Sequence, residues 1–170
     1  MELQQIIEKD QSLTKFIQNL TAKTRSLLTG VNRGALCLLL EQILTQRHNV
    51  LFIVEETENK AQLLYQSLSG VVPDDQRYLF LVEADLALAK ATVSPDVMSD
   101  RIKTLMFLMT KKPGIVITTP QGLQYPLTPP ARYAAAEKEL SIGQTEDLAA
   151  LQAWLVQNGY EKQTLVARPG

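Results

Sequence analysis

Apolar residues follow two alternating patterns along the first two-thirds of the chain. Three- and four-residue spacings, which give one apolar face per helix, predict helices over residues 2–22 (with a break at 10–12), 32–46, 57–69 and 96–110. Continuous apolar runs, typical of strands buried on both faces, predict strands at 25–28, 50–54, 78–82 and 115–119. Strands that alternate with helices in this way predict an α/β fold, a doubly wound parallel sheet with helices on both faces.

The pattern changes after residue 120. Pro126, Pro129 and Pro130 cluster there and indicate a boundary, so we expect domains at 1–128 and 129–170. The second part predicts a half-exposed strand at 135–142, a helix from about Thr145 to Asn158 and a last strand at 160–166. We interpret it as an incomplete small α+β domain, too small to hold a good core alone, and therefore expect a fragment of a longer protein.

Composition excludes several classes of function. The 170 residues are 45% hydrophobic and 21% charged with a net charge of −1, so no overall charge favours nucleic acid or a membrane surface. No signal peptide is visible, and the longest apolar run, 35–40, is too short to span a bilayer. Cys37 is the only cysteine, which excludes an internal disulfide and suggests a buried thiol in a reducing, cytoplasmic setting.

A degenerate phosphate loop is the feature most informative for function. Residues 26–36 run from a short apolar segment through a small-residue turn into an apolar helix, the layout of a strand–loop–helix nucleotide site. Arg33 stands where the phosphate-binding Lys belongs, and Gly34 stands where a Ser or Thr would hold Mg²⁺. Two interpretations remain open, a nucleotide fold that has lost its nucleotide and an ordinary βα turn. The loop residues in question are Thr29, Gly30, Asn32, Arg33 and Gly34.

No catalytic or metal-binding constellation stands out elsewhere. His48, the only histidine, lies between a helix and a strand and is expected to be structural. Glu55 and Glu56 follow a strand at its carboxyl end and could bind a cation, or form a solvated helix start. No Asp-Glu pair follows an apolar strand to activate water on ATP. We therefore predict no catalytic residue, no metal and no cofactor.

Four segments in order resemble one family. They are the loop at 29–33, the helix with Ser94-Pro95-Asp96 and Arg101-Ile102, the strand at 114–123 with Thr118-Thr119-Pro120, and Gly159-Tyr160-Glu161. Their order and spacing over residues 12–170 are similar to the N-terminal module of the bacterial transcription-repair coupling factor, itself similar to UvrB of nucleotide excision repair.

The resemblance implies a non-catalytic, UvrB-like adaptor in DNA repair with a degenerate, helicase-like P-loop fold. In that family the full protein is an ATP-dependent DNA translocase that removes stalled RNA polymerase and recruits UvrA, and its motor lies downstream. The resemblance therefore implies UvrA as a partner of this chain, with RNA polymerase and DNA contacted through other domains. Tyr160, Glu161 and Arg168 are the candidate UvrA-binding residues. Residues 83–93 carry no aromatic side chain with which to stack on bases.

Two other functions stay open on the residues. One is an active nucleotide-binding or helicase domain with an atypical phosphate loop. The other is direct DNA binding, which would weaken steeply with salt. The candidate DNA-facing residues are Thr118, Thr119 and Arg101, with Lys103, Lys111 and Lys112 nearby in the sequence.

Overall fold

A computed structural model describes residues 11–20, 25–82, 94–127, 129–160 and 162. The chain divides into two compact units, Met1–Tyr125 and Pro126–Gly170, and each is considered by itself. Three expected features lie wholly or partly outside the described residues. They are the part of the first helical region before residue 11, the connection at 83–93 and most of the strand at 160–166.

The first unit contains a parallel sheet interleaved with helices, as the sequence predicts. The helices are α2 (Gln11–Asn19), α3 (Arg33–Arg47), α4 (Glu58–Leu68), α5 (Pro95–Thr110) and α6 (Pro120–Gln124), with a 3₁₀ turn η1 (Asp74–Gln76). The strands are β1 (Val50–Val54), β2 (Arg77–Phe80) and β3 (Gly114–Thr118). Short α6 begins where sequence reasoning expected an irregular segment, and Pro120 at its first position fits that start.

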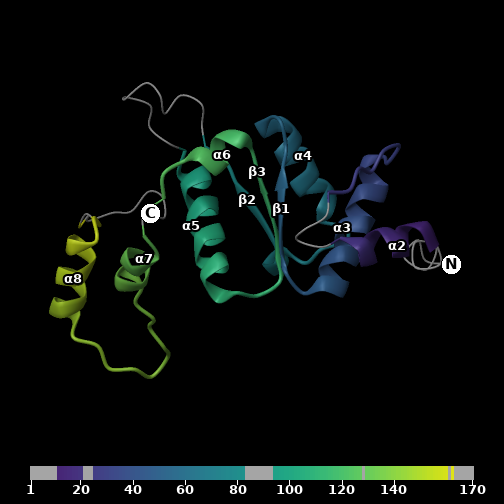
Figure 1. The fold of residues 1–170 in the computed structure, drawn as a ribbon. Helices are drawn as coiled ribbons and strands as arrows, with labels where there is room; N and C mark the ends of the chain where they lie inside the picture. The colour runs from purple at the N-terminus through teal and green to yellow at the C-terminus, as the bar shows by residue number, and fades with distance from the viewer. Residues whose placement is uncertain (1–10, 21–24, 83–93, 128, 161, 163–170) are drawn as a thin grey trace. The chain divides into compact units, whose positions relative to one another are not determined.

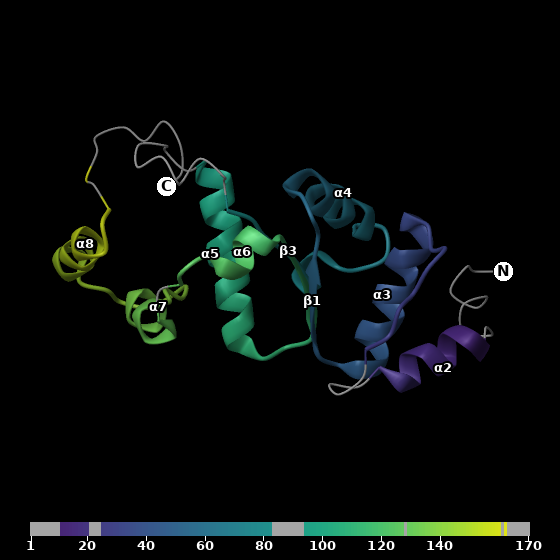
Figure 2. The same cartoon turned by 45° about the horizontal axis from the view of Figure 1, so that its top comes forward.

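The sheet has the order β1-β3-β2, and both pairs are parallel. Thr118 at the end of β3 pairs with Val54 on one side and Phe80 on the other. From β1 the chain runs through α4 to β2, on the far side of β3. It then returns through α5 to β3, which lies between the other two strands. Because right-handed crossovers in opposite directions place their helices on opposite faces, α4 and α5 should lie on the two faces of the sheet. Figures 1 and 2 show this arrangement, with α3 and α4 on one side of the strands and α5 on the other.

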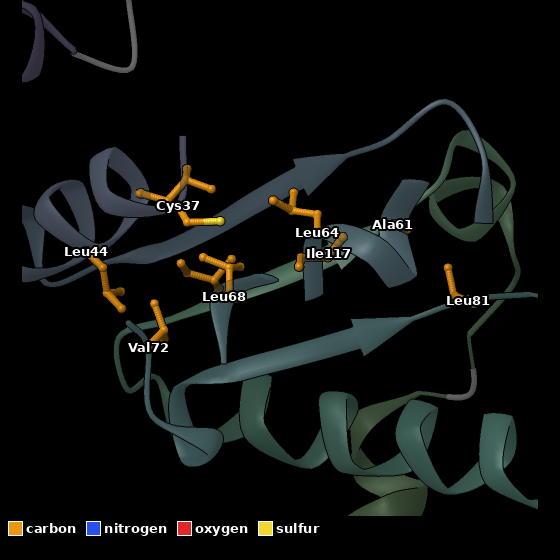
Figure 3. Close-up of a cluster of buried hydrophobic side chains, with 10 residues drawn as sticks. Cys37, Leu44, Ala61, Leu64, Leu68, Val72, Leu81 and Ile117 are labelled. Atoms are coloured by element: carbon orange, nitrogen blue, oxygen red, sulfur yellow. The ribbon is translucent and has the colours of Figure 1, made fainter. Parts of the chain in front are cut away.

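Alternating side chains of β3 fill two separate cores. Ile115 and Ile117 point into the cluster made with α3 and α4, which Figure 3 shows in close-up. Val116 belongs to the cluster on the α5 face, where the rings of Tyr78 and Phe107 stack with centroids 4.0 Å apart. These three side chains are at most 1% exposed, so this strand is buried on both faces, as its continuous apolar run predicts.

Helix α2 is attached to α3 at both an apolar and a polar contact. Ile17 is 3% exposed and packs with Leu39 and Ile43 of α3. At the end of α2, Arg47 Nη2 donates to the backbone oxygens of Ile17 at 2.5 Å and of Gln18 at 3.0 Å. A cation at the negative end of a helix stabilises it and satisfies carbonyls that lack partners within the helix.

The second unit holds helices α7 (Pro130–Ala136) and α8 (Leu148–Gln157). Asp147 caps α8 by accepting a hydrogen bond from the Ala149 amide at 2.9 Å. Lys138 and Glu146 form an ion pair across the segment that joins the two helices. No strand occurs in the part of this unit that the structure describes, so its expected α+β character is not seen there.

Two strand predictions are wrong. Residues 25–28 are irregular: Leu27 is 89% exposed, and Leu28 packs on the cluster of α2 and α3 instead of joining the sheet. The strand expected at 135–142 is replaced by the end of α7 and an irregular segment in which Ile142 is fully exposed. A strand needs a neighbour to pair with, and in the described residues neither segment has one.

We expect Gly122→Ala to destabilise the first unit. A Cβ at Gly122 would lie 2.2 Å from Thr118 Oγ1 and 3.1 Å from the Phe80 backbone oxygen. Overpacking of this kind costs about 1–3 kcal/mol in the free energy of unfolding, measurable by urea denaturation. Gly70→Ala is the matched control, because a Cβ there meets nothing within 4 Å. Equal effects of the two substitutions would contradict this account of α6 packing.

Candidate functional site

The segment predicted to be a degenerate phosphate loop, residues 29–34, lies at the edge of the sheet where such folds bind ligands. Only His48 and Asn49 separate the end of α3 from the start of β1, so the two elements run in opposite directions. The start of α3 therefore lies beside the carboxyl end of β1 (Figure 1). In doubly wound sheets ligands bind outside the carboxyl ends of the strands.

The first turn of α3 is capped by the chain itself. Asn32 is extended, and its side-chain Oδ1 accepts a hydrogen bond from the Ala35 amide at 2.9 Å. Its backbone oxygen accepts from the Leu36 amide at 2.9 Å. Amides at a helix start are the donors that hold phosphate in nucleotide sites. One such donor is already used by Asn32, which sequence reasoning did not foresee.

The remaining loop residues supply neither a metal ligand nor a buried cation. Gly30 adopts a left-handed φ of +75°, which suits the turn into α3. A Cβ at Gly34 would lie 3.6 Å from Asn32 Oδ1, so the backbone would accommodate a serine or threonine there, but no hydroxyl is present. The side chains of Arg33 and Thr29 are both exposed. The loop thus offers an exposed arginine in place of the predicted lysine and no hydroxyl at Gly34, and its assignment as a former phosphate site stays a prediction.

The carboxylates after β1 take part in local structure. The Glu55 amide donates to the Thr118 carbonyl at 2.8 Å and prolongs the pairing of β1 with β3. Glu56 forms an ion pair with Lys60 on α4, which Thr57 caps through its hydroxyl at 3.3 Å from the Lys60 amide. Across the described ranges, no group of three or more His, Cys, Asp or Glu side chains could hold a metal ion.

Thr118 and Thr119 form buried hydrogen bonds at the carboxyl edge of the sheet. Thr118 Oγ1 donates to the Phe80 carbonyl at 2.7 Å, and Thr119 caps α6 by accepting from the Gly122 amide at 3.3 Å. Both threonines are 1% exposed. Their DNA-facing role stays a prediction, and it would require this edge to open, because in the structure both hydroxyls face the interior.

Arg101, the third candidate for a DNA contact, is buried as well. Its side chain is 7% exposed and lies over two rings, with the guanidinium carbon 4.1 Å from the Tyr125 centroid and 5.6 Å from the Phe80 centroid. The structure thus brings Arg101 and Thr118 to the same residue, Phe80, at the carboxyl edge. No sequence signal links Arg101 to Tyr125, because the two lie 24 positions apart on different elements. Lys103, Lys111 and Lys112 are exposed on or after α5.

Cys37 and His48 have structural surroundings. Cys37 is 3% exposed within the core of α3 and α4 (Figure 3), as the sequence predicts. Burial raises the pKa of its thiol, and the weaker effect of the Arg33 charge lowers it. His48 ends α3 in a left-handed conformation, φ 51°, and its amide donates to the Leu44 carbonyl at 3.0 Å. The thiol is therefore protonated and shielded at neutral pH, unlike that of a nucleophile.

The second unit presents an apolar groove along α8. Tyr160, a candidate UvrA-binding residue, is 56% exposed beside it, while Glu161 and Arg168 lie outside the described residues. The groove has a volume of about 650 Å³ and is lined by Ala149, Gln152, Ala153, Leu155, Val156, Gln157, Tyr160 and Lys162. Val156, which is 61% exposed, adds apolar surface to the groove. In the described part of the chain, no helix is both long and apolar enough to cross a membrane.

Comparison with known proteins finds transcription-repair-coupling factors among the relatives of this chain. The chain is 24% identical over 162 residues to the transcription-repair-coupling factor of Staphylococcus aureus (strain USA300), covering 95% of this chain and 14% of that protein. It is 26% identical over 144 residues to the transcription-repair-coupling factor of Staphylococcus epidermidis (strain ATCC 12228 / FDA PCI 1200), covering 85% of this chain and 12% of that protein. The chain thus corresponds to a small part of these relatives. No family model matches it.

The raised pKa of Cys37 predicts a specific pH dependence of stability. Below the ordinary thiol pKa, the Cys37 thiol is protonated in both the folded and the unfolded chain. The buried thiol then makes its full contribution to the free energy of unfolding. Above about pH 8.5 the unfolded thiol ionises first, so stability falls as the pH rises toward the folded-state pKa. Urea denaturation should show a steeper decline for the wild type than for Cys37→Ala over this range. Parallel pH profiles would contradict the burial argument.

Proposed function

We propose that this chain is a non-catalytic, UvrB-like module of a transcription-repair coupling protein, which recruits UvrA and restrains a motor elsewhere in the longer polypeptide. The observation that carries the proposal is the similarity to transcription-repair-coupling factors over 95% of the chain. A role in transcription-repair coupling follows from that similarity. The adaptor role and UvrA as the partner are inferred from the sequence resemblance and from the site.

The degenerate loop supports the non-catalytic part of the proposal. It lies at the ligand-binding edge of an α/β sheet, but Gly34 offers no hydroxyl for Mg²⁺, and Asn32 already bonds the Ala35 amide. Phosphoryl transfer depends on placing Mg²⁺ and cations around the phosphates. Without a hydroxyl for Mg²⁺ at Gly34, a helicase-like fold would serve as a scaffold, and this speaks against the rival function as an active ATPase.

We expect the 170-residue chain to show no ATP turnover above a protein-free control. The assay is release of inorganic phosphate from Mg-ATP, with the Arg33→Ala variant measured in parallel. The variant should match the wild type, because Arg33 is exposed and no Mg²⁺ ligand stands beside it. Turnover that survives repurification and disappears in Arg33→Ala would establish the rival function.

The groove along α8 is the surface that we assign to the protein partner. Val156 and Tyr160 are more than half exposed at the groove, and small side chains at Ala149 and Ala153 leave room for an incoming apolar side chain. Exposed apolar surface around a pocket is typical of protein-binding sites. Tyr160, which the resemblance implicates, lines this groove.

We expect Ala153→Asp to weaken binding to purified UvrA by at least about tenfold, because a buried unpaired charge in an interface is strongly unfavourable. Ala150→Asp is the matched control: Ala150 is an exposed alanine on α8 that does not line the groove. Biolayer interferometry with immobilised UvrA measures both. Equal affinities for the two variants would place the partner on another surface, and circular dichroism checks that α8 is retained.

A further inference from the structure

Arg101 is a buried cation that forms no ion pair with any of the described residues. It is 7% exposed, and its Nε and Nη1 atoms are fully covered without a hydrogen-bond acceptor. Burying a charge is costly unless it is paired, and arginine nitrogens in proteins normally have carboxylate, phosphate or carbonyl acceptors. The two ring contacts offset only part of this cost.

A second arginine in the same unit shows what a satisfied site looks like. Arg77 lies over the Tyr65 ring, 4.6 Å from its centroid, much as Arg101 lies over Tyr125. Its Nη2 pairs with Asp74, and its Nη1 donates to the Tyr65 carbonyl at 3.3 Å. Only Nε of Arg77 lacks an acceptor. Stacking on a ring is therefore compatible with normal pairing, and Arg101 differs because both its Nε and its Nη1 lack an acceptor.

The surroundings of Arg101 hold the guanidinium in place. Phe80, one of its two ring contacts, is fixed at the end of β2: its carbonyl accepts from Thr118 Oγ1, and Gly122 packs against its backbone. Tyr125, the other ring, follows α6 directly, and its amide donates to the Gly122 carbonyl at 3.3 Å. Rigid side chains at the carboxyl edge of a parallel sheet are the usual support of a ligand group.

Nearby charges leave Arg101 un-neutralised. The neighbouring carboxylate, Asp100, is 3.7 Å from Lys103 Nζ on the solvent side of α5, and it makes no ion pair with Arg101. In the described residues no other acidic side chain forms an ion pair with Arg101 either. A positive charge that is buried, rigid and unpaired is suited to a small anion.

We propose that Arg101 is the anchor of an oxyanion-binding site at the carboxyl edge of the sheet, framed by Tyr125 and Phe80. The ligand is a single phosphate or carboxylate group. Because Arg101 Nε and Nη1 are fully covered in the structure, the oxygens of this ligand would accept from them only once the side chains that cover the guanidinium move aside. This site is separate from the degenerate loop at Arg33. It stands whether or not the chain binds UvrA, because it depends on none of the residues of the α8 groove.

The direct test is a titration of the 170-residue chain with inorganic phosphate, followed by the ¹⁵N-¹H NMR signal of Arg101 Nε. Sodium chloride at matched ionic strength is the reference, and acetate is titrated in a separate arm. A saturable shift of the Arg101 signal with phosphate alone assigns a phosphate ligand, and a shift with acetate assigns a carboxylate. No saturable shift with either anion at matched ionic strength would overturn the proposal.

Four variants locate the binding. Arg101→Met keeps an unbranched apolar side chain against the two rings and should weaken phosphate or acetate binding, read from the Tyr125 ring signals, by at least about tenfold. Arg101→Lys, which keeps the charge without the planar donors, should bind more weakly than the wild type. Arg77→Met and Arg33→Ala should bind as the wild type does. Undiminished binding by Arg101→Met, or loss of binding in Arg33→Ala, would overturn the assignment. If Arg101→Met does not fold, the binding of Arg101→Lys and the Arg101 signal of the wild type decide whether the anion binds at Arg101.

Discussion

The burial of β3 on both faces is the constraint on which the rest of the first unit depends. Ile115 and Ile117 join the core under α3 and α4, while Val116 joins the core under α5. The backbone of β3 pairs with β1 on one side and with β2 on the other. Because one five-residue strand links both cores and both neighbours, the carboxyl edge at Thr118 is positioned by nearly every element of the unit.

At that edge the chain satisfies its own polar groups. Asn32, Thr57 and Thr119 each cap the helix that they precede, through a side-chain oxygen that accepts from a first-turn amide. In a nucleotide-binding sheet such amides are the donors available to phosphate. Here they stabilise helices instead, each cap contributing about 1 kcal/mol. The fold thus has the geometry of a ligand-binding edge whose helix-start amides are capped from within the chain, and Arg101 lies at that edge with Nε and Nη1 lacking acceptors.

Sequence patterns predicted those elements whose burial is continuous or periodic. The apolar runs at 50–54 and 115–119 and the helical spacing in α3, α4 and α5 depend on local residues, so these elements were predictable, with β3 observed at Gly114–Thr118. Residues 25–28 and 135–142 were not, because an apolar pair or a short alternation becomes a strand only beside another strand. The Arg101–Tyr125 stack and the Thr118–Phe80 hydrogen bond join residues far apart in sequence, and only the fold brings them together.

The central claim is that this chain acts by binding a protein and not by using a nucleotide. Calorimetric titration of the 170-residue chain with purified UvrA, in the absence of any nucleotide, tests it most directly. The account predicts saturable binding with a dissociation constant of about 1 μM or tighter, the range of a specific protein interface. No heat of binding at concentrations well above that value, with both proteins folded, would contradict the adaptor function of this chain.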